Sequence, residues 1–182
     1  TRGRAFEDEV QTAKAEGTLP DFPMIVMIDG QSASASEVLS GALLENDRAI
    51  VLGTRSYGKG SVQSVIPLRT TPGAQLKMTE QGYFLPSGRS IQRKDGSAEW
   101  GVDPSPGFFV DLTTEEMRGL WEARRDGEVI RSEGADGVES KGTPSWVRQT
   151  LSDPQLAAAL DAMQMRIDQG EWKPVGGDAP SG

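Results

Sequence analysis

The amino-acid sequence predicts an α/β fold, in which a mixed sheet with helices is followed by a C-terminal helical tail. Near the start of the chain, two short apolar runs flank a segment whose apolar residues recur at helical spacing, the pattern of a strand–helix–strand unit. Two segments with period-two alternation follow and favour further strands. After residue 112 the remaining signals are those of helices and linkers. We therefore assign residues 1–112 to the core and 113–182 to an appendage.

Five segments of the core carry a strand or helix pattern. Apolar runs stopped by turn residues predict buried strands, helical spacing of apolar residues predicts a helix, and alternation predicts half-exposed strands. In chain order these are a strand at Met24–Ile28, a helix at Glu37–Asn46, and strands at Arg48–Gly53, Ser61–Leu68 and Gln75–Leu85. A glycine-bounded loop at 53–60 joins the second strand to the third.

The appendage is predicted to be helical, with a flexible acidic linker inside it. Thr113–Arg125 begins with a Thr-x-x-Glu capping box and carries an apolar stripe, which indicates a helix. Residues 126–145 are rich in Gly, Ser, Glu and Asp and are expected to be mobile. A second helix is predicted to start at 152–155, with Leu156–Ile167 as its body, before a disordered Pro/Gly-rich tail. We expect the tryptophans of this region to be packing or tail residues: Trp121, Trp146 and Trp172.

Composition argues against several classes of function. A net charge of −8 and a pI near 4.7 argue against nucleic-acid binding, which requires a basic face. The chain has no cysteine, which removes disulfides and thiolate nucleophiles, and no histidine, so a Ser-His-Asp arrangement cannot form within it. A hydroxyl activated by lysine, or a carboxylate mechanism, remains. We expect no metal and no other cofactor.

Ser34 lies in the segment Ser34-Ala-Ser-Glu37, where the first predicted strand turns into the helix. Amide groups at such a helix start can hold an anion, so the amide of Ala35 could donate a hydrogen bond to a tetrahedral intermediate. The same Ser-x-x-Glu spacing is also a capping box, in which the serine and Glu37 only satisfy the helix end. These four residues alone favour the capping interpretation.

Lys59 lies in the glycine-rich segment 53–61, Gly-Thr-Arg-Ser-Tyr-Gly-Lys-Gly-Ser. This segment nearly matches the phosphate-binding loop Gly-x4-Gly-Lys-Ser/Thr. However, Gly60 stands where the magnesium-binding hydroxyl should be, and a strand pattern follows where a helix should begin. A nucleotide-binding module is therefore disfavoured. The alternative interpretation, in which the segment has no catalytic or binding role, is a glycine turn that carries a solvated lysine.

Taken together, the motifs resemble those of the carboxy-terminal processing proteases, also called tail-specific proteases. Three motifs occur in the order found in that family: the Ser-Ala-Ser-Glu segment at 34–37, Gly-Lys-Gly-Ser-Val-Gln at 58–63, and Gly-Tyr-Phe-Leu-Pro-Ser-Gly-Arg-Ser-Ile-Gln at 82–92. The resemblance spans about residues 24–104 and its motifs are specific. It implies that the core is part of a crotonase-like protease fold that acts through a Ser–Lys pair.

The resemblance also implies a role for each matching residue. Ser34 matches the nucleophile and Lys59 matches the base. Gln63 matches the glutamine that orients this lysine, and Glu37 matches an acidic position that supports the site. Ala35 remains the residue expected to donate to the oxyanion.

The chemistry of a Ser–Lys pair sets an expectation for the surroundings of Lys59. A lysine can accept the serine proton only in its neutral form, and burial favours that form. The glycines that flank Lys59 are expected to let the backbone pack tightly and to direct the side chain inward. Gln63 is neutral, so it can hydrogen-bond the amine without stabilising the cation.

Partners and location follow from the resemblance alone. It implies an endopeptidase that cleaves unfolded or tagged proteins near apolar C-termini, in the bacterial cell envelope or periplasm. It leaves open a membrane anchor in a preceding segment, a homo-oligomer and a regulatory adaptor. No nucleic-acid or nucleotide partner is expected. The alternative function is a non-catalytic peptide-binding scaffold of the same fold.

Two departures from the family pattern are evident. Family members carry a PDZ domain and an upstream part of the core, which supplies the second oxyanion donor, and neither is found in these residues. We therefore expect these 182 residues alone to be inactive or poorly active. Residues 93–100 form a polar insertion before the Gly-Val-Asp-Pro turn at 101–104.

Overall fold

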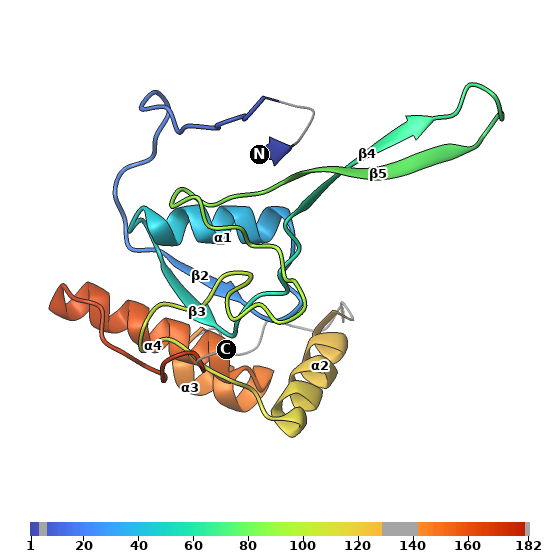
Figure 1. Cartoon of the computed structure of the whole chain (residues 1–182). Coiled ribbons are helices and arrows are strands. Elements are labelled where there is room, and N and C mark those ends of the chain that lie inside the picture. The colour runs from blue at the N-terminus through green and yellow to red at the C-terminus, as the bar shows by residue number, and fades with distance from the viewer. Residues whose placement is uncertain (4–6, 129–141, 181–182) are drawn as a thin grey trace.

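Two parallel strands lie at the centre of the fold in the computed structural model of the chain (Figure 1). The structure describes residues 1–3, 7–128 and 142–180, without the side chains of 126–128. Strand β2 (Ile25–Ile28) pairs in parallel with β3 (Ile50–Gly53), and helix α1 (Ala35–Glu45) connects them. Parallel neighbours require such a crossover. The predicted strand–helix–strand unit and the α/β class are therefore confirmed, with boundaries that differ by one or two residues.

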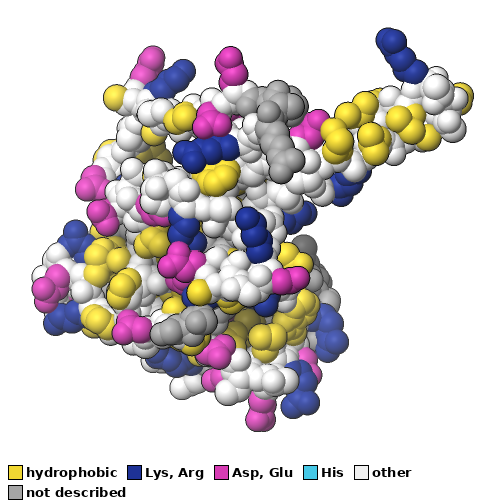
Figure 2. Space-filling model, viewed as in Figure 1, with side chains coloured by type: hydrophobic (Ala, Val, Ile, Leu, Met, Phe, Trp, Pro, Cys, Tyr) yellow, Lys and Arg dark blue, Asp and Glu magenta, His cyan; other side chains and the backbone are white. Residues whose placement is uncertain are grey.

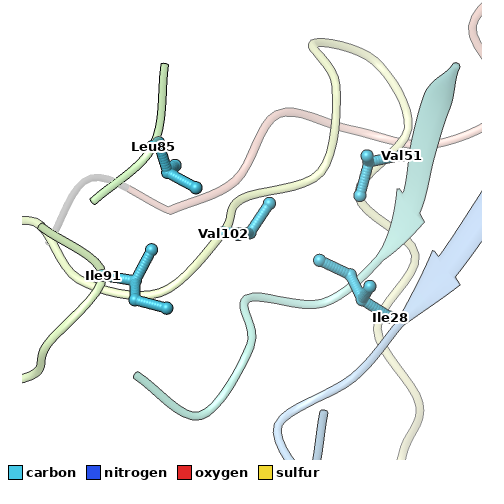
Figure 3. Close-up of a cluster of buried hydrophobic side chains, with 5 residues drawn as sticks. All are labelled: Ile28, Val51, Leu85, Ile91 and Val102. Carbon is cyan, nitrogen blue, oxygen red and sulfur yellow. The ribbon is translucent and has the colours of Figure 1, made fainter. Parts of the chain in front are cut away.

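The two faces of this strand pair carry two separate hydrophobic clusters. Val51 and Leu52, both fully buried, are neighbours in β3 and point to opposite faces. Figure 3 shows the first cluster. Ile28 of β2 and Val51 of β3 face three side chains from later in the chain: Leu85, Ile91 and Val102. The second cluster joins the strands to helix α4 (Pro154–Gln169): Leu52, Phe108, Ala158, Ala159 and Ala162. The alanines allow α4 to approach the sheet closely.

A long hairpin projects away from this core (Figure 1). Strands β4 (Ser61–Pro67) and β5 (Gln75–Gly82) are antiparallel, and the short strand β1 (Arg2–Gly3) pairs with the base of β5. The register places Ile66 opposite Leu76 and Ser64 opposite Met78, so large apolar residues share one face. Hydrophobic side chains line this projecting arm in Figure 2, and Ile66, Leu76 and Met78 are exposed. Both strands were predicted, whereas β1 was not.

Helix α2 (Thr114–Glu128) begins with the predicted capping box. The amide and the hydroxyl of Thr113 donate to the carboxylate of Glu116 at 2.8 Å each, and these bonds lower the pKa of Glu116. A short helix α3 (Pro144–Trp146), a π-helical turn η2 (Val147–Leu151) and α4 complete the described chain. None of the helices in the described ranges is long and apolar enough to cross a membrane.

Two expectations for the appendage differ from the structure. The ends of the expected linker are ordered, because α2 continues to Glu128 and Thr143 caps α3, while most of the linker (129–141) lies outside the described residues. The expected disordered tail instead pairs with the core: the amide of Val175 donates to Gly107 at 3.1 Å and that of Gly177 to Phe109 at 3.0 Å. Trp172 and Val175 pack on the second cluster, which explains the order.

Gly53→Ala should strongly destabilise the fold. Gly53 has a φ of 125°, and a Cβ there would lie 2.0 Å from the carbonyl oxygen of Ile28, so the two parallel strands would have to separate. We expect the free energy of unfolding to fall by more than about 3 kcal/mol in chemical denaturation. Gly73→Ala is the matched control, since Gly73 also has a positive φ but nothing within 4 Å of a Cβ. It should cost about 1–2 kcal/mol from backbone strain alone. Equal losses would show that the contact with Ile28 is unimportant.

Candidate active site

Ser34 occupies a strained turn between β2 and α1. It is the N-cap of α1, with a φ of 59° and a ψ of −119°. A positive φ is rare for a residue other than glycine and costs about 1–3 kcal/mol, a strain that tends to occur at functional sites. A nucleophilic serine on a sharp strand-to-helix turn is a known way to expose its hydroxyl. This geometry distinguishes Ser34 from its neighbours.

The two neighbouring serines have other environments. The hydroxyl of Ser32 donates to the Asp29 carboxylate at 3.2 Å and accepts from the Asp29 amide at 3.1 Å, so it belongs to the turn. Ser36 lies inside α1 and is exposed. Ala35 is the first residue of α1, and an amide at this position has no acceptor within the helix. Its N–H is therefore free of an acceptor within α1, and its oxyanion role stays a prediction.

The carboxylate of Glu37 joins the Ser34 turn to the Lys59 loop. Glu37 is fully buried. Its Oε2 accepts from the amide of Ser34 at 2.8 Å and from the amide of Lys59 at 2.8 Å. The two amide nitrogens contact one oxygen and therefore lie within twice that distance of each other. Glu37 thus forms a direct hydrogen-bonded link between the backbones of the two predicted catalytic residues, and its supporting role in catalysis stays a prediction.

The second oxygen of Glu37 holds the rest of the loop. Its Oε1 accepts from the hydroxyl of Ser56 and from the amide of Gly58, both at 2.6 Å. The Ser56 hydroxyl in turn accepts from the amide of Val102 at 2.7 Å, which ties in a third segment. All four groups that donate to Glu37 are neutral. A buried carboxylate is tolerated only when its oxygens are satisfied in this way.

The glycines around Lys59 pack tightly, as predicted. A Cβ at Gly58 would lie 2.7 Å from Trp100, and one at Gly60 would lie 2.8 Å from the amide nitrogen of Gln92. A strand, β4, follows Gly60, so the helix that a phosphate-binding loop requires is replaced by a strand. The expectation that the Lys59 side chain is buried is wrong for the described chain, in which it is exposed. The tight packing holds the peptide, whose N–H bonds to Glu37, and the side chain is left outside.

Gln63 does not meet Lys59 in the structure. It is exposed on β4, and its side-chain amide donates to the hydroxyl of Thr79 on β5 at 3.2 Å. In the described ranges, no hydrogen bond joins Gln63 to Lys59. The geometry thus brings together Ser34, Glu37 and the backbone of Lys59, whereas the orienting role of Gln63 stays a prediction.

The polar insertion at 93–100 forms one wall of the Lys59 loop. Trp100 lies between two guanidinium groups, with Arg55 at 4.4 Å and Arg93 at 4.8 Å from its ring centre. Arg55 also forms an ion pair with Asp103 at 2.5 Å. Neither this stack nor the role of Ser56 was predicted from the sequence. The polar insertion contains Arg93 and Trp100, but nothing local in the sequence indicates which loop they contact.

Comparison with known proteins establishes the family. Residues 1–105 match the model of peptidase family S41, and the chain belongs to this family. A carboxy-terminal-processing protease of Bartonella bacilliformis is 36% identical over 181 residues, which cover 96% of this chain and 39% of that protein. A chloroplastic carboxyl-terminal-processing peptidase 3 of Arabidopsis thaliana is 44% identical over 93 residues, 51% of this chain and 17% of that protein. The predicted family resemblance is confirmed.

A solved structure is also similar in sequence. A photosystem II D1 C-terminal processing protease is 36% identical, and the match covers 50% of this chain and 20% of that chain with a TM-score of 0.41. The chain thus spans less than half the length of each of these relatives.

Glu37→Gln should destabilise the chain far more than Glu116→Gln, the same change at the equivalent capping position of α2. Each oxygen of Glu37 accepts two hydrogen bonds, so an amide nitrogen in either orientation would face two donors. We expect a loss of about 3 kcal/mol or more in the free energy of unfolding, measured by chemical denaturation. Glu116→Gln changes the same capping-box position in α2, where the side chain is exposed and glutamine caps as well as glutamate. It should cost less than about 1 kcal/mol. Similar losses would mean that Glu37 acts only as a cap.

Proposed function

We propose that this chain carries the catalytic pair of a serine endopeptidase that cleaves proteins near their C-termini through an acyl-enzyme. One observation carries the proposal: the buried carboxylate of Glu37 binds the backbone of Ser34 and of Lys59 through one oxygen. The strained backbone of Ser34 supports its assignment as the nucleophile. Membership of a peptidase family supports the reaction class.

The proposed reaction uses the neutral amine of Lys59 as the base. The amine takes the proton of the Ser34 hydroxyl as Oγ attacks the carbonyl carbon of the substrate, and the oxyanion accepts a hydrogen bond from the Ala35 amide. The peptide C–N bond then breaks, and Lys59 returns its proton to the leaving amine. Lys59 then takes a proton from a water molecule as the water oxygen attacks the ester carbonyl carbon; the ester C–O bond breaks, and Lys59 returns the proton to Oγ of Ser34.

The exposure of Lys59 places a condition on this mechanism. An exposed ammonium is well hydrated, so the amine must be covered before it can act as a base. The bound polypeptide substrate, or another part of the protein, would cover the amine. Gln63 would then leave Thr79 and donate to or accept from the amine, which orients it towards Ser34.

Substrates and location are proposed on the family relationship. The relatives are named carboxy-terminal-processing proteases, which supports cleavage near a C-terminus. We propose unfolded or tagged proteins with apolar C-termini as the substrates. We further propose a location in the cell envelope or periplasm.

A non-catalytic peptide-binding protein is the second candidate. It is favoured by one specific observation: Lys59 is exposed and Gln63 bonds to Thr79, so the three side chains are not assembled. The strained turn at Ser34 has no use in such a protein, which is why we rank this candidate second.

Ser34→Ala should abolish cleavage of an unfolded, apolar-tailed polypeptide by the gene-length protein. Removal of the nucleophile should reduce kcat/KM by more than about 10³-fold while the thermal midpoint is retained. Ser36→Ala is the matched control, because Ser36 is exposed in α1 two residues away and should tolerate the change. Retained cleavage in Ser34→Ala would reassign the nucleophile, and loss in both variants would point to a disturbed turn.

Lys59→Arg should be as inactive as Lys59→Ala, because arginine cannot give up its proton at working pH. We expect kcat to fall by about 10²–10⁴-fold in both variants, measured on the same substrate. Gln63→Ala should cause a smaller loss, since it removes only the orientation of the amine. Lys77→Arg, an exposed lysine on β5, is the control for the change of side chain. Full activity in Lys59→Arg would exclude Lys59 as the base and require a different one, whereas a parent protein that binds the substrate without cleaving it would favour the peptide-binding candidate.

A further inference from the structure

A cavity of about 310 Å³ lies where the two parallel strands end. Asp29 directly follows β2 and Thr54 directly follows β3, and both line it. Helix α2 forms the opposite wall, beside these strand ends in Figure 1. The carboxyl ends of parallel strands are the usual place for ligands in α/β folds. The position of the cavity therefore suggests a binding site.

The wall formed by α2 is apolar and exposed. In the apolar stripe of this helix Leu120 is buried, while Met117 is 44% and Trp121 is 61% exposed. All three line the cavity. The expectation that Trp121 is a packing residue is thus wrong. A large exposed aromatic ring at the mouth of a cavity is available to a ligand.

The polar wall is negatively charged. Asp29 and Asp111 contribute carboxylates, and Arg124 is the one cation among the described lining residues. Arg124 is already paired, since it donates to the buried Asp153 at 3.1 Å. Asp111 is exposed and bonds only to the amide of Leu112, at 2.9 Å, among the contacts described. The unpaired charge facing a ligand is therefore that of the two carboxylates.

An apolar wall opposite carboxylates is complementary to a side chain with an apolar stem and a positive end. Lysine and arginine have this form, because their methylene stems pack on apolar surface while the charged end reaches a polar region. The ring of Trp121 also attracts a cation placed over its face. A carboxylate ligand would be repelled by Asp29 and Asp111, and a purely apolar one would leave their negative charges uncompensated.

The cavity adjoins the turn that carries Ser34. Gln31 lines the cavity and lies three residues before Ser34. The Asp29 carboxylate accepts from the amides of Gln31 and Ser32 at 2.9 and 3.0 Å, which fixes this turn. A polypeptide with its scissile bond at Ser34 can therefore place a nearby side chain in the cavity.

We propose that this cavity is a specificity subsite that receives a lysine or arginine side chain of the polypeptide substrate. The proposal rests on the proposed peptidase function, because it names the substrate chemistry of the same site. It is compatible with an apolar C-terminus, which occupies a different position along the substrate.

The test uses peptides that differ at one position and the gene-length protein. In an unfolded, apolar-tailed peptide, each residue within four of the scissile bond is replaced in turn by Lys or by Glu. We expect one position at which Lys gives about tenfold higher kcat/KM than Glu, through KM. Asp111→Lys should reverse this preference, and Trp121→Ala should weaken it. Asp168→Lys, with the same charge change at an exposed position of α4, should leave the preference intact.

A binding measurement separates this proposal from the peptidase itself. Fluorescence anisotropy of the labelled Lys and Glu peptides is recorded with Ser34→Ala and with Ser34→Ala/Asp111→Lys, after circular dichroism has shown that both fold. Tighter binding of the Lys peptide that Asp111→Lys abolishes supports the subsite even if the parent cleaves nothing. Equal binding and cleavage of both peptides at every position would overturn the subsite and leave the peptidase standing.

Discussion

The arrangement of the site depends on the four hydrogen bonds of the buried Glu37 carboxylate. The Ser34 turn follows β2 and the Lys59 loop follows β3, and beyond the strand ends the Tyr57 amide donates to the Ser32 carbonyl at 2.9 Å. Glu37 accepts hydrogen bonds from three backbone amides and one hydroxyl, and thereby links the Ser34 turn to three further groups of the Lys59 loop. These bonds fix the backbone of Lys59, while its exposed side chain takes no part in them.

The same strand ends generate both the candidate active site and the neighbouring cavity. Gly53 allows β3 to approach the Ile28 carbonyl closely. After this point the segments that follow β2 and β3 diverge, and each forms its own loop. The Ser34 turn departs along α1, and α2 packs beyond the strand ends to close the cavity. A side chain bound in the cavity and a peptide bond at Ser34 would thus be positioned by one short turn. This common origin is why we assign the cavity to substrate recognition.

The fold was predictable wherever the pattern of residues is local. Apolar runs, helical spacing and the Thr113 cap depend on neighbours in the chain, and these elements were found with small shifts. Contacts between distant segments were not predictable. The tail was expected to be disordered because its composition is polar and glycine-rich, but Trp172 and Val175 find a hydrophobic cluster formed by residues far along the chain. The exposure of the Lys59 side chain also depends on a contact between distant segments. The flanking glycines indicate tight packing, but the hydrogen bond to Glu37 determines that the peptide group of Lys59, and not its side chain, faces inward.

The Ser-x-x-Glu spacing left open a helix cap or a catalytic site, and the contacts of Glu37 go beyond those of a helix cap. A cap needs one backbone bond and can be fully exposed, as Glu116 is at the start of α2. Glu37 makes the equivalent bond to Ser34, but it is also buried and accepts three further donors from the segment 56–59. Those three contribute nothing to the start of α1. Their consequence is to hold the backbone of Lys59 close to that of the strained Ser34, and the proposed function rests on this arrangement.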